Sequence, residues 1–189
     1  MRSVVFKFIG FSILIGLLLS MGCGGDSSAP SERLPTLVQV KVTDGYILDA
    51  NVSLNGQEFI YDGNITYESY QASVANPSDT LISKGGVHDL NGNGMVDKED
   101  VVAIEMKAPG NYHNINPFTT LLAENRNLSV KELLDHYTFD EGVYFGSAED
   151  INNFDIDIVQ ASTGAEGNPE IMRQAAILTL LFSVIKDSR

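Results

Sequence analysis

Twelve residues near the middle of the chain, Asp89 to Asp100, have the spacing of a calcium-binding loop. Such a loop needs oxygen-bearing side chains at its first, third, fifth, ninth and twelfth positions, which here are Asp89, Asn91, Asn93, Asp97 and Asp100. Its sixth position is Gly94, which permits a sharp turn, and the carbonyl oxygen of Met95 would follow. The predicted calcium ligands are therefore Asp89, Asn91, Asn93, Met95, Asp97 and Asp100.

The chemistry of these residues suits calcium, which takes about six to eight oxygen ligands at about 2.3–2.6 Å. Affinity falls as ligand charge falls. Two ligands are neutral asparagines, and Asp100 stands where a longer glutamate binds best. We expect a dissociation constant of about 10⁻⁴–10⁻³ M, or about a decade tighter. Val96 is expected to pack inward. The alternative is a polar Asn-Gly turn between two strands.

The sequence on either side of the loop indicates strands. Residues 83–86 (Ser-Lys-Gly-Gly) offer no entering helix, although the calcium-loop template usually has one. Val102, Ile104 and Met106 alternate with other residues, which is typical of a strand, whereas the template asks for an exiting helix over 101–107. We therefore expect a calcium loop that joins two strands.

The N-terminus has the pattern of a secretory signal. Arg2 and Lys7 precede an apolar run over residues 8–19, which is too short for an ordinary membrane span. Cys23, the only cysteine in the chain, lies where a bacterial lipoprotein is acylated. We predict a signal over 1–22 and lipidation at Cys23, with outer-membrane or surface sorting favoured by Gly24. Ordinary cleavage with a free thiol, or an uncleaved anchor, are the alternatives.

Composition limits the partners of the mature chain. Residues 23–35 indicate a flexible tether. Removal of 1–22 would take away Arg2 and Lys7 and no acidic residue, so the net charge would go from −13 to −15. Such a charge argues against nucleic acid and against electrostatic attraction to anionic lipid. The membrane is therefore a partner through the lipid anchor alone.

The remaining chain divides near residue 111. Short alternating segments separated by turn dipeptides such as Asn55-Gly56 predict strands over 37–43, 50–54, 57–61, 65–70 and 80–83. Helix-start signals follow at Asn116-Pro117, Ser129 and Asn168-Pro169. We predict an α+β protein, with a small antiparallel β-sandwich over 36–110 that carries the loop and a helical region over 111–189.

The last predicted helix, from Glu170 to about Ile185, is apolar nearly all round. It is too short to span a bilayer. We expect it to pack in the core, with Leu181 buried. The alternative is a helix that binds a partner protein or a second copy of the chain.

Catalytic patterns are weak in this sequence. His88, His113 and His136 are the only histidines, and none stands in a zinc-binding spacing. The sequence has no nucleophile elbow, P-loop or dinucleotide fingerprint. We therefore expect no enzyme, although a pair of carboxylates brought together by folding would make a hydrolase the alternative.

The segments 42–47 and 50–52, the loop 89–100 and the stretch 116–122 together resemble secreted and surface-anchored bacterial proteins. In those proteins an Ig-like, Cna-B-type or carboxypeptidase-regulatory-like sandwich carries an Asp-x-Asn-x-Asn-Gly calcium loop. The loop alone also resembles those of EF-hands and dockerins, but the acidic stretch 150–157 lacks the glycine of a second loop. The resemblance implies a structural, adhesive or ligand-binding lipoprotein of the cell envelope, or an assembly module that docks through its last helix.

Overall fold

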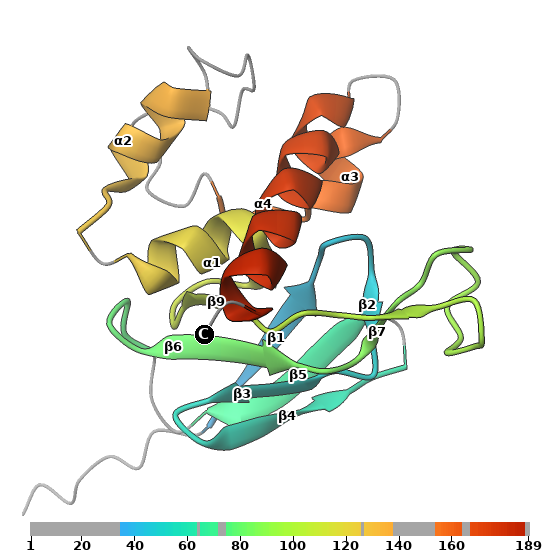
Figure 1. Cartoon of the computed structure of the whole chain (residues 1–189). Coiled ribbons are helices and arrows are strands. Elements are labelled where there is room, and N and C mark those ends of the chain that lie inside the picture. Colours follow the sequence, from blue (N-terminus) through green and yellow to red (C-terminus); the bar gives the residue numbers. More distant parts are fainter. Residues whose placement is uncertain are drawn as a thin grey trace, which may run out of the picture. The chain divides into compact units, whose positions relative to one another are not determined.

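The structure is a computed structural model that describes residues 35–63, 65–71, 75–125, 127–137, 154–163 and 167–187. Residues 33–189 form one compact unit. The predicted signal, and Cys23 with it, lie outside the described residues. The predicted α+β class is confirmed, because a strand-rich half is followed by a helical half (Figure 1).

The strands form two sheets. The larger is a seven-stranded mixed sheet in the order β10-β1-β5-β4-β3-β6-β9, and the smaller has the order β2-β7-β8. The strands of the larger sheet are β1 (Thr36–Val42), β3 (Asn51–Leu54), β4 (Gln57–Tyr61), β5 (Thr66–Gln71), β6 (Thr80–Lys84), β9 (Met106–Pro109) and β10 (Asn114–Ile115). Those of the smaller sheet are β2 (Ile47–Leu48), β7 (Val87–His88) and β8 (Val101–Val102).

Local sequence explains most of the larger sheet. In β1 the alternating residues Val40 and Val42 are buried, as the period-two pattern predicted. Asn55 and Gly56 both have positive φ and close the β3–β4 hairpin, which confirms the Asn-Gly turn. The pairing that makes the sheet mixed is β1 with β10, which run parallel, and β10 lies in the stretch that was expected to be helical.

Four helices follow among the described residues: α1 (Pro117–Glu124), α2 (Val130–Asp135), α3 (Ile158–Ser162) and α4 (Pro169–Asp187). Three of them begin at the predicted signals. Asn116 and Ser129 each form a capping box, and the Asn168 side chain accepts a hydrogen bond from the Glu170 backbone N–H at 3.0 Å. Because these signals act within one turn of chain, they can be recognised without knowing the fold.

The sheet and the helices share one hydrophobic core. Tyr67 and Leu81 from the sheet and Phe118 and Ile158 from the helices belong to the same buried cluster. The ring centroids of Phe118 and Tyr137 lie 5.0 Å apart, edge to face, and the Phe154 ring stacks 5.7 Å from Phe118. The helical half therefore completes the core of the strand-rich half.

Asn116 lies at the junction between sheet and helices and is fully buried. Its Oδ1 accepts from the Thr119 backbone N–H at 2.9 Å and so caps α1. Its Nδ2 donates to the carbonyl oxygens of Phe154 and Ile156, at 2.9 and 3.2 Å. One side chain thus fixes the start of α1 and the segment that leads into α3.

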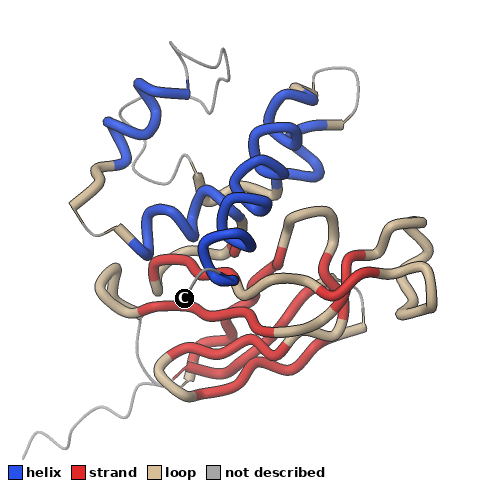
Figure 2. Tube along the Cα trace, viewed as in Figure 1, coloured by secondary structure: helices blue, strands red, loops and turns tan. Residues whose placement is uncertain are grey.

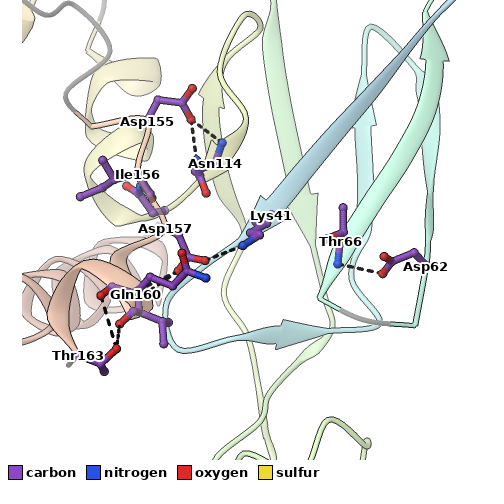
Figure 3. A network of polar contacts seen from close by, with 11 residues as sticks. Lys41, Asp62, Thr66, Asn114, Asp155, Ile156, Asp157, Gln160 and Thr163 are labelled. Atoms are coloured by element: carbon purple, nitrogen blue, oxygen red, sulfur yellow. Dashed lines mark hydrogen bonds and ion pairs between the residues drawn. The ribbon is translucent and has the colours of Figure 1, made fainter. Parts of the chain in front are cut away.

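Side chains from the helical half also cover both edges of the larger sheet. At the β9 edge, the Lys107 backbone N–H donates to Thr120 Oγ1 at 2.9 Å, and its carbonyl oxygen accepts from the Thr119 and Thr120 hydroxyls. At the β10 edge, the Asp155 carboxylate accepts from the backbone N–H groups of His113 and Asn114 at 2.8 and 2.6 Å. Figure 3 shows Asp155 reaching Asn114 from the segment before α3.

Helix α4 corrects one expectation. Its first half packs in the core, where Ile171, Ala175 and Leu178 are buried. Its second half exposes apolar side chains, and Leu181, which was expected to be buried, is 51% exposed. The sequence could not separate the halves, because both are apolar and only tertiary contacts decide which residues are covered. Among the described helices, α4 included, none is long and apolar enough to cross a bilayer.

We predict that Tyr67→Phe will lower the free energy of unfolding by about 1–3 kcal/mol, because it leaves buried polar groups unpaired. The buried Tyr67 hydroxyl donates to the Ile47 carbonyl oxygen and accepts from the Ala50 backbone N–H, both at 3.0 Å. Burial, the main cause, raises the pKa of Tyr67 to about 12, so the hydroxyl keeps its proton. Urea unfolding measures the change. Tyr70→Phe is the control, since Tyr70 is 66% exposed, and equal effects of the two changes would contradict the assignment.

Candidate functional site

The loop 89–100 connects β7 and β8, which pair antiparallel with Val87 opposite Val102 and His88 opposite Val101. The prediction of a loop between two strands is thus confirmed, and residues 101–102 are strand. Figure 2 shows the loop as a long tan segment that extends beyond these two short strands. The loop is therefore a twelve-residue hairpin connection.

The base of this hairpin is fixed by close backbone packing. Gly86 has φ +77°, and a Cβ there would lie 2.6 Å from the Leu48 carbonyl oxygen, so glycine is required. The Asp89 backbone N–H donates to the Tyr46 carbonyl oxygen at 3.0 Å. His88 Nδ1 donates to the Asp44 carbonyl oxygen at 2.7 Å. The backbone of Asp89, the first predicted ligand, is thus fixed at the base of the hairpin.

Within the loop, Asp89 organises the first turn. Its Oδ1 accepts from the Asn93 backbone N–H at 3.1 Å and its Oδ2 from the Gly94 N–H at 2.8 Å. The side-chain oxygens of Asn91 and Asn93 accept from the backbone N–H groups two residues further on, at 3.0 and 2.7 Å. Gly94 has φ +72°, which confirms the sharp turn predicted there. The first half of the loop is therefore wound around its own polar side chains.

Asp97 joins the two halves of the loop. Its Oδ2 accepts from the side-chain amides of Asn91 and Asn93, each at 2.9 Å. Its backbone N–H donates to Asp100 Oδ2 at 2.8 Å. Hydrogen bonds hold the pKa of Asp97 below its usual value. The largest effect comes from the Glu99 backbone N–H, followed by the side-chain amides of the two asparagines. The five predicted side-chain ligands thus belong to one hydrogen-bonded network.

The predicted calcium ligands in this network are three carboxylates, two amides and one backbone carbonyl. In the described part of the chain, no three His, Cys, Asp or Glu side chains gather as a metal-binding group. Asp89, Asp97 and Asp100, the three carboxylates of the predicted set, therefore do not gather as such a group here. The amides of Asn91 and Asn93 turn their nitrogens to Asp97, so each must rotate by about 180° to offer oxygen to a cation. With that rotation the set would offer calcium only oxygen ligands, which is the type that calcium prefers.

The exposure of the loop corrects a second expectation. Val96 was expected to pack inward, but it is 55% exposed, because the two-residue strands at the base offer no core beneath it. Met95, the next residue before it, is 65% exposed. The loop is therefore held by polar contacts rather than by packing.

The second acidic stretch, near residue 155, has structural roles where the structure describes it. The Asp157 carboxylate caps α3 by accepting from the Val159 and Gln160 backbone N–H groups at 3.2 and 3.1 Å. It also pairs with Lys41 Nζ at 2.9 Å (Figure 3). Asp155 covers the edge of β10. Both carboxylates are thus engaged in holding α3 to the sheet.

A polar link between the hairpin and α4 was not predicted from the sequence. Asp44, in the turn after β1, is 8% exposed, and its Oδ2 accepts from the Thr179 hydroxyl at 2.7 Å. Its backbone carbonyl holds His88, whose Nε2 lies 4.0 Å from the same carboxylate oxygen. Asp44 and Thr179 are 135 residues apart, so no local pattern could reveal the contact.

A cavity of about 430 Å³ lies beside the start of β6 and the end of α1, away from the loop. It is lined mainly by apolar side chains, among them Pro77, Pro109, Tyr112, Leu122 and Leu128. Its volume lies within the range of small-molecule sites, about 300–1,000 Å³. The sequence had given no sign of this cavity, because residues far apart in the chain line it.

Comparison with known proteins gave no match to a family model, to a curated protein or to a solved structure.

We predict that Asp44→Asn will change how stability depends on pH. Burial, the largest cause, raises the pKa of Asp44 above the usual 3.8, although Thr179 and His88 act in the opposite direction. Because the folded protein then binds the proton more tightly than the unfolded chain, protonated Asp44 stabilises the fold. This stability is fully present below the pKa of the unfolded chain and is lost as pH rises through the pKa of the folded protein. Asparagine keeps an oxygen for Thr179 but does not titrate.

The measurement is urea unfolding in a calcium chelator at a series of pH values upward from about 4. Relative to Asp44→Asn, the wild type should lose stability as pH rises. Asp79→Asn serves as the control, because the Asp79 carboxylate lies in the turn before β6, where it accepts from the Asn76 backbone N–H at 2.9 Å. A constant difference between wild type and Asp44→Asn across this pH range contradicts the prediction.

Proposed function

We propose that this chain is a membrane-anchored, calcium-binding lipoprotein with a structural, adhesive or ligand-binding role at the bacterial cell envelope. The observation that carries the proposal is the loop between β7 and β8. Its five oxygen-bearing side chains at calcium-loop spacing belong to one hydrogen-bonded network, in which Asp97 contacts Asn91, Asn93 and Asp100, and Asp89 contacts the Asn93 backbone. A bound calcium ion would neutralise part of the negative charge of the three carboxylates.

The lipid anchor is supported by sequence. The basic residues, the short apolar run and the single cysteine at position 23 form a lipoprotein-like signal. Two acyl chains at Cys23 would hold the protein on a bilayer without electrostatic attraction, which the net charge of −15 left after removal of residues 1–22 would oppose. We propose the outer membrane or the cell surface as its location.

The absence of recognisable catalytic patterns in the sequence supports a binding or structural role rather than an enzyme. The cavity of about 430 Å³ lined by Tyr112 and Leu122 supports the ligand-binding form of this role. Asp155 and Asp157, the carboxylates of the second acidic stretch that the structure describes, cap backbone N–H groups and pair with Lys41. Their engagement weakens the alternative of a hydrolase.

A second candidate function is an assembly module that docks through α4. The observation that favours it is the exposed apolar second half of this helix, where Leu180 is 65% and Val184 59% exposed. The two candidates are compatible, because the loop and this part of α4 are separate surfaces. Loss of association on changing the exposed face, with stability unchanged, would test this candidate.

We predict that calcium will raise the melting temperature of the protein and that magnesium will do so much less. Magnesium demands an octahedron at about 2.0–2.1 Å and gives up water reluctantly. At a calcium concentration of about 100 times the dissociation constant, one site adds about 2.7 kcal/mol to the free energy of unfolding. Asp89→Ala should abolish most of this gain. Thermal melting during titration with each ion measures it.

Glu99→Gln is the matched control for this titration. Glu99 lies in the same loop and carries the same charge, but it is not a predicted ligand. The variant should keep most of the calcium gain. An equal gain from magnesium, or an equal loss in Glu99→Gln and Asp89→Ala, would show that the loop is not a specific calcium site.

We predict that Cys23→Ser will abolish fatty-acid labelling of the protein in a bacterial host. The thiol is the only one in the chain, so no other cysteine can be acylated in its place. Metabolic labelling with a clickable fatty acid, followed by membrane fractionation, measures the change. Labelling that survives in Cys23→Ser would rule out this anchor, and Ser20→Ala serves as a control for altering the signal itself.

A further inference from the structure

The cavity of about 430 Å³ beside the start of β6 has the size and the lining of a small-molecule site. Three segments of the chain line it: the turn 77–80, the turn 109–112, and the stretch 122–130 that joins α1 to α2. Tyr112 and Leu122, which form part of its apolar wall, belong to the hydrophobic core of the protein. We call this space the β6–α1 cavity.

Two of these segments are locked to each other. The Asp79 backbone N–H donates to the Asn76 carbonyl oxygen at 3.0 Å, and the Asp79 carboxylate accepts from the Asn76 N–H at 2.9 Å. The Gly110 N–H donates to the Asp79 carbonyl oxygen at 2.9 Å. A Cβ at Gly110 would lie 2.6 Å from the Asp79 Cβ, so the two turns are in direct contact.

The third segment is also held before any ligand arrives. The Leu128 backbone N–H donates to the Asn125 carbonyl oxygen at 2.9 Å, and Ser129 forms the capping box of α2. The Leu128 and Val130 side chains, which line the cavity, pack against the core. The β6–α1 cavity is therefore preformed, and a ligand would not have to order its walls.

One side chain in the wall has an unsatisfied hydrogen-bonding group. Asn111 lines the cavity, and its Oδ1 is buried without a hydrogen-bond partner among the described residues. A buried acceptor that lacks a donor is costly, so a donor brought by a ligand would be favoured here. The terminal torsion of asparagine is broad, so a small rotation of the amide can bring Oδ1 to the cavity surface. The ligand thus needs a hydrogen-bond donor.

Charge narrows the ligand further. Among the described residues that line the cavity, Asp79 is the only charged one, and none is a lysine, arginine or histidine. Asn111 follows Gly110, which touches Asp79, so the carboxylate and the amide belong to adjoining parts of the wall. The net charge of −13 also favours a cation over an anion. Asp79 is only partly buried, so a charged group bound there need not lose all its water.

We propose that the β6–α1 cavity binds a small organic amine, with its ammonium group at Asp79 and Asn111 and its apolar body against Leu122. An ammonium group has three N–H donors, enough for both oxygens, and a carboxylate accepts about four hydrogen bonds, so the Asn76 N–H does not exhaust Asp79. The inference rests on the ligand-binding form of the proposed function and names the class of ligand. It does not depend on calcium or on the lipid.

The test is isothermal titration calorimetry of the full chain in nonionic detergent and a calcium chelator, with micelles alone as the blank. Three probes share one apolar body: 2-phenylethylamine is a cation, 2-phenylethanol is neutral and 3-phenylpropionate is an anion. The amine should bind about tenfold more tightly than the alcohol, because hydrogen bonds to charged groups are stronger. The anion should show no binding, since it brings no donor and meets a carboxylate.

Variants locate the binding. Asp79→Asn should weaken binding of the amine about tenfold and remove its advantage over the alcohol. Asn111→Leu should also weaken binding, yet it should not lower the melting temperature of the unliganded protein, because it removes a buried oxygen that has no partner. Asp135→Asn is the matched control. It makes the same change of charge on α2, outside the cavity, and should leave the affinity unchanged.

The outcomes separate this inference from the functions on which it rests. Equal affinity for the amine and the alcohol, or amine binding that survives both Asp79→Asn and Asn111→Leu, overturns the proposal but leaves a ligand-binding role standing. Absence of binding by all three probes overturns the proposal and the ligand-binding role of the cavity together. The calcium titration and the fatty-acid labelling of Cys23 are unaffected by either result, so the lipoprotein and its calcium loop fail or stand separately.

Discussion

The buried side chain of Asn116 holds the two halves of the molecule together. It is the first residue after β10 and the cap of α1, and its amide also holds the carbonyl oxygens of Phe154 and Ile156. The Phe154 ring stacks on Phe118. The same segment leads into Asp157, which caps α3 and pairs with Lys41 on β1. One side chain, through its acceptor and both of its donors, therefore joins the end of β10, the start of α1 and the segment before α3.

This arrangement explains which parts of the fold could be predicted from sequence. The caps at Asn116 and Ser129 and the turn at Asn55-Gly56 depend on residues within four positions, so their patterns are sufficient. Strand β10 was missed, because two residues carry no periodic signal and the strand exists only where β1 pairs with it. The exposed half of α4 was missed for the same reason, since its neighbours in space are far away in sequence.

The candidate site divides in the same way. The turn at Gly94 and the strands on either side of the loop follow from spacing and residue type, and the structure bears them out. The exposure of Val96 does not follow from spacing or residue type, because burial depends on which residues pack against a side chain and not on its position in a template. Nor does the contact of Asp44 with Thr179, which ties the turn beside the hairpin to α4. Calcium itself remains a proposal.

The covered edges of the larger sheet have a consequence for how the protein behaves when crowded. An open edge strand offers unpaired backbone groups to which a strand of another molecule can add, and such addition leads to aggregates. Here Lys107 of β9 is bonded by Thr119 and Thr120, and the N–H groups of His113 and Asn114 are taken by Asp155. Any association at these edges must therefore displace side chains first. Shortening the chain before Asp155 would remove this protection at the β10 edge and leave that edge open to the addition of another strand.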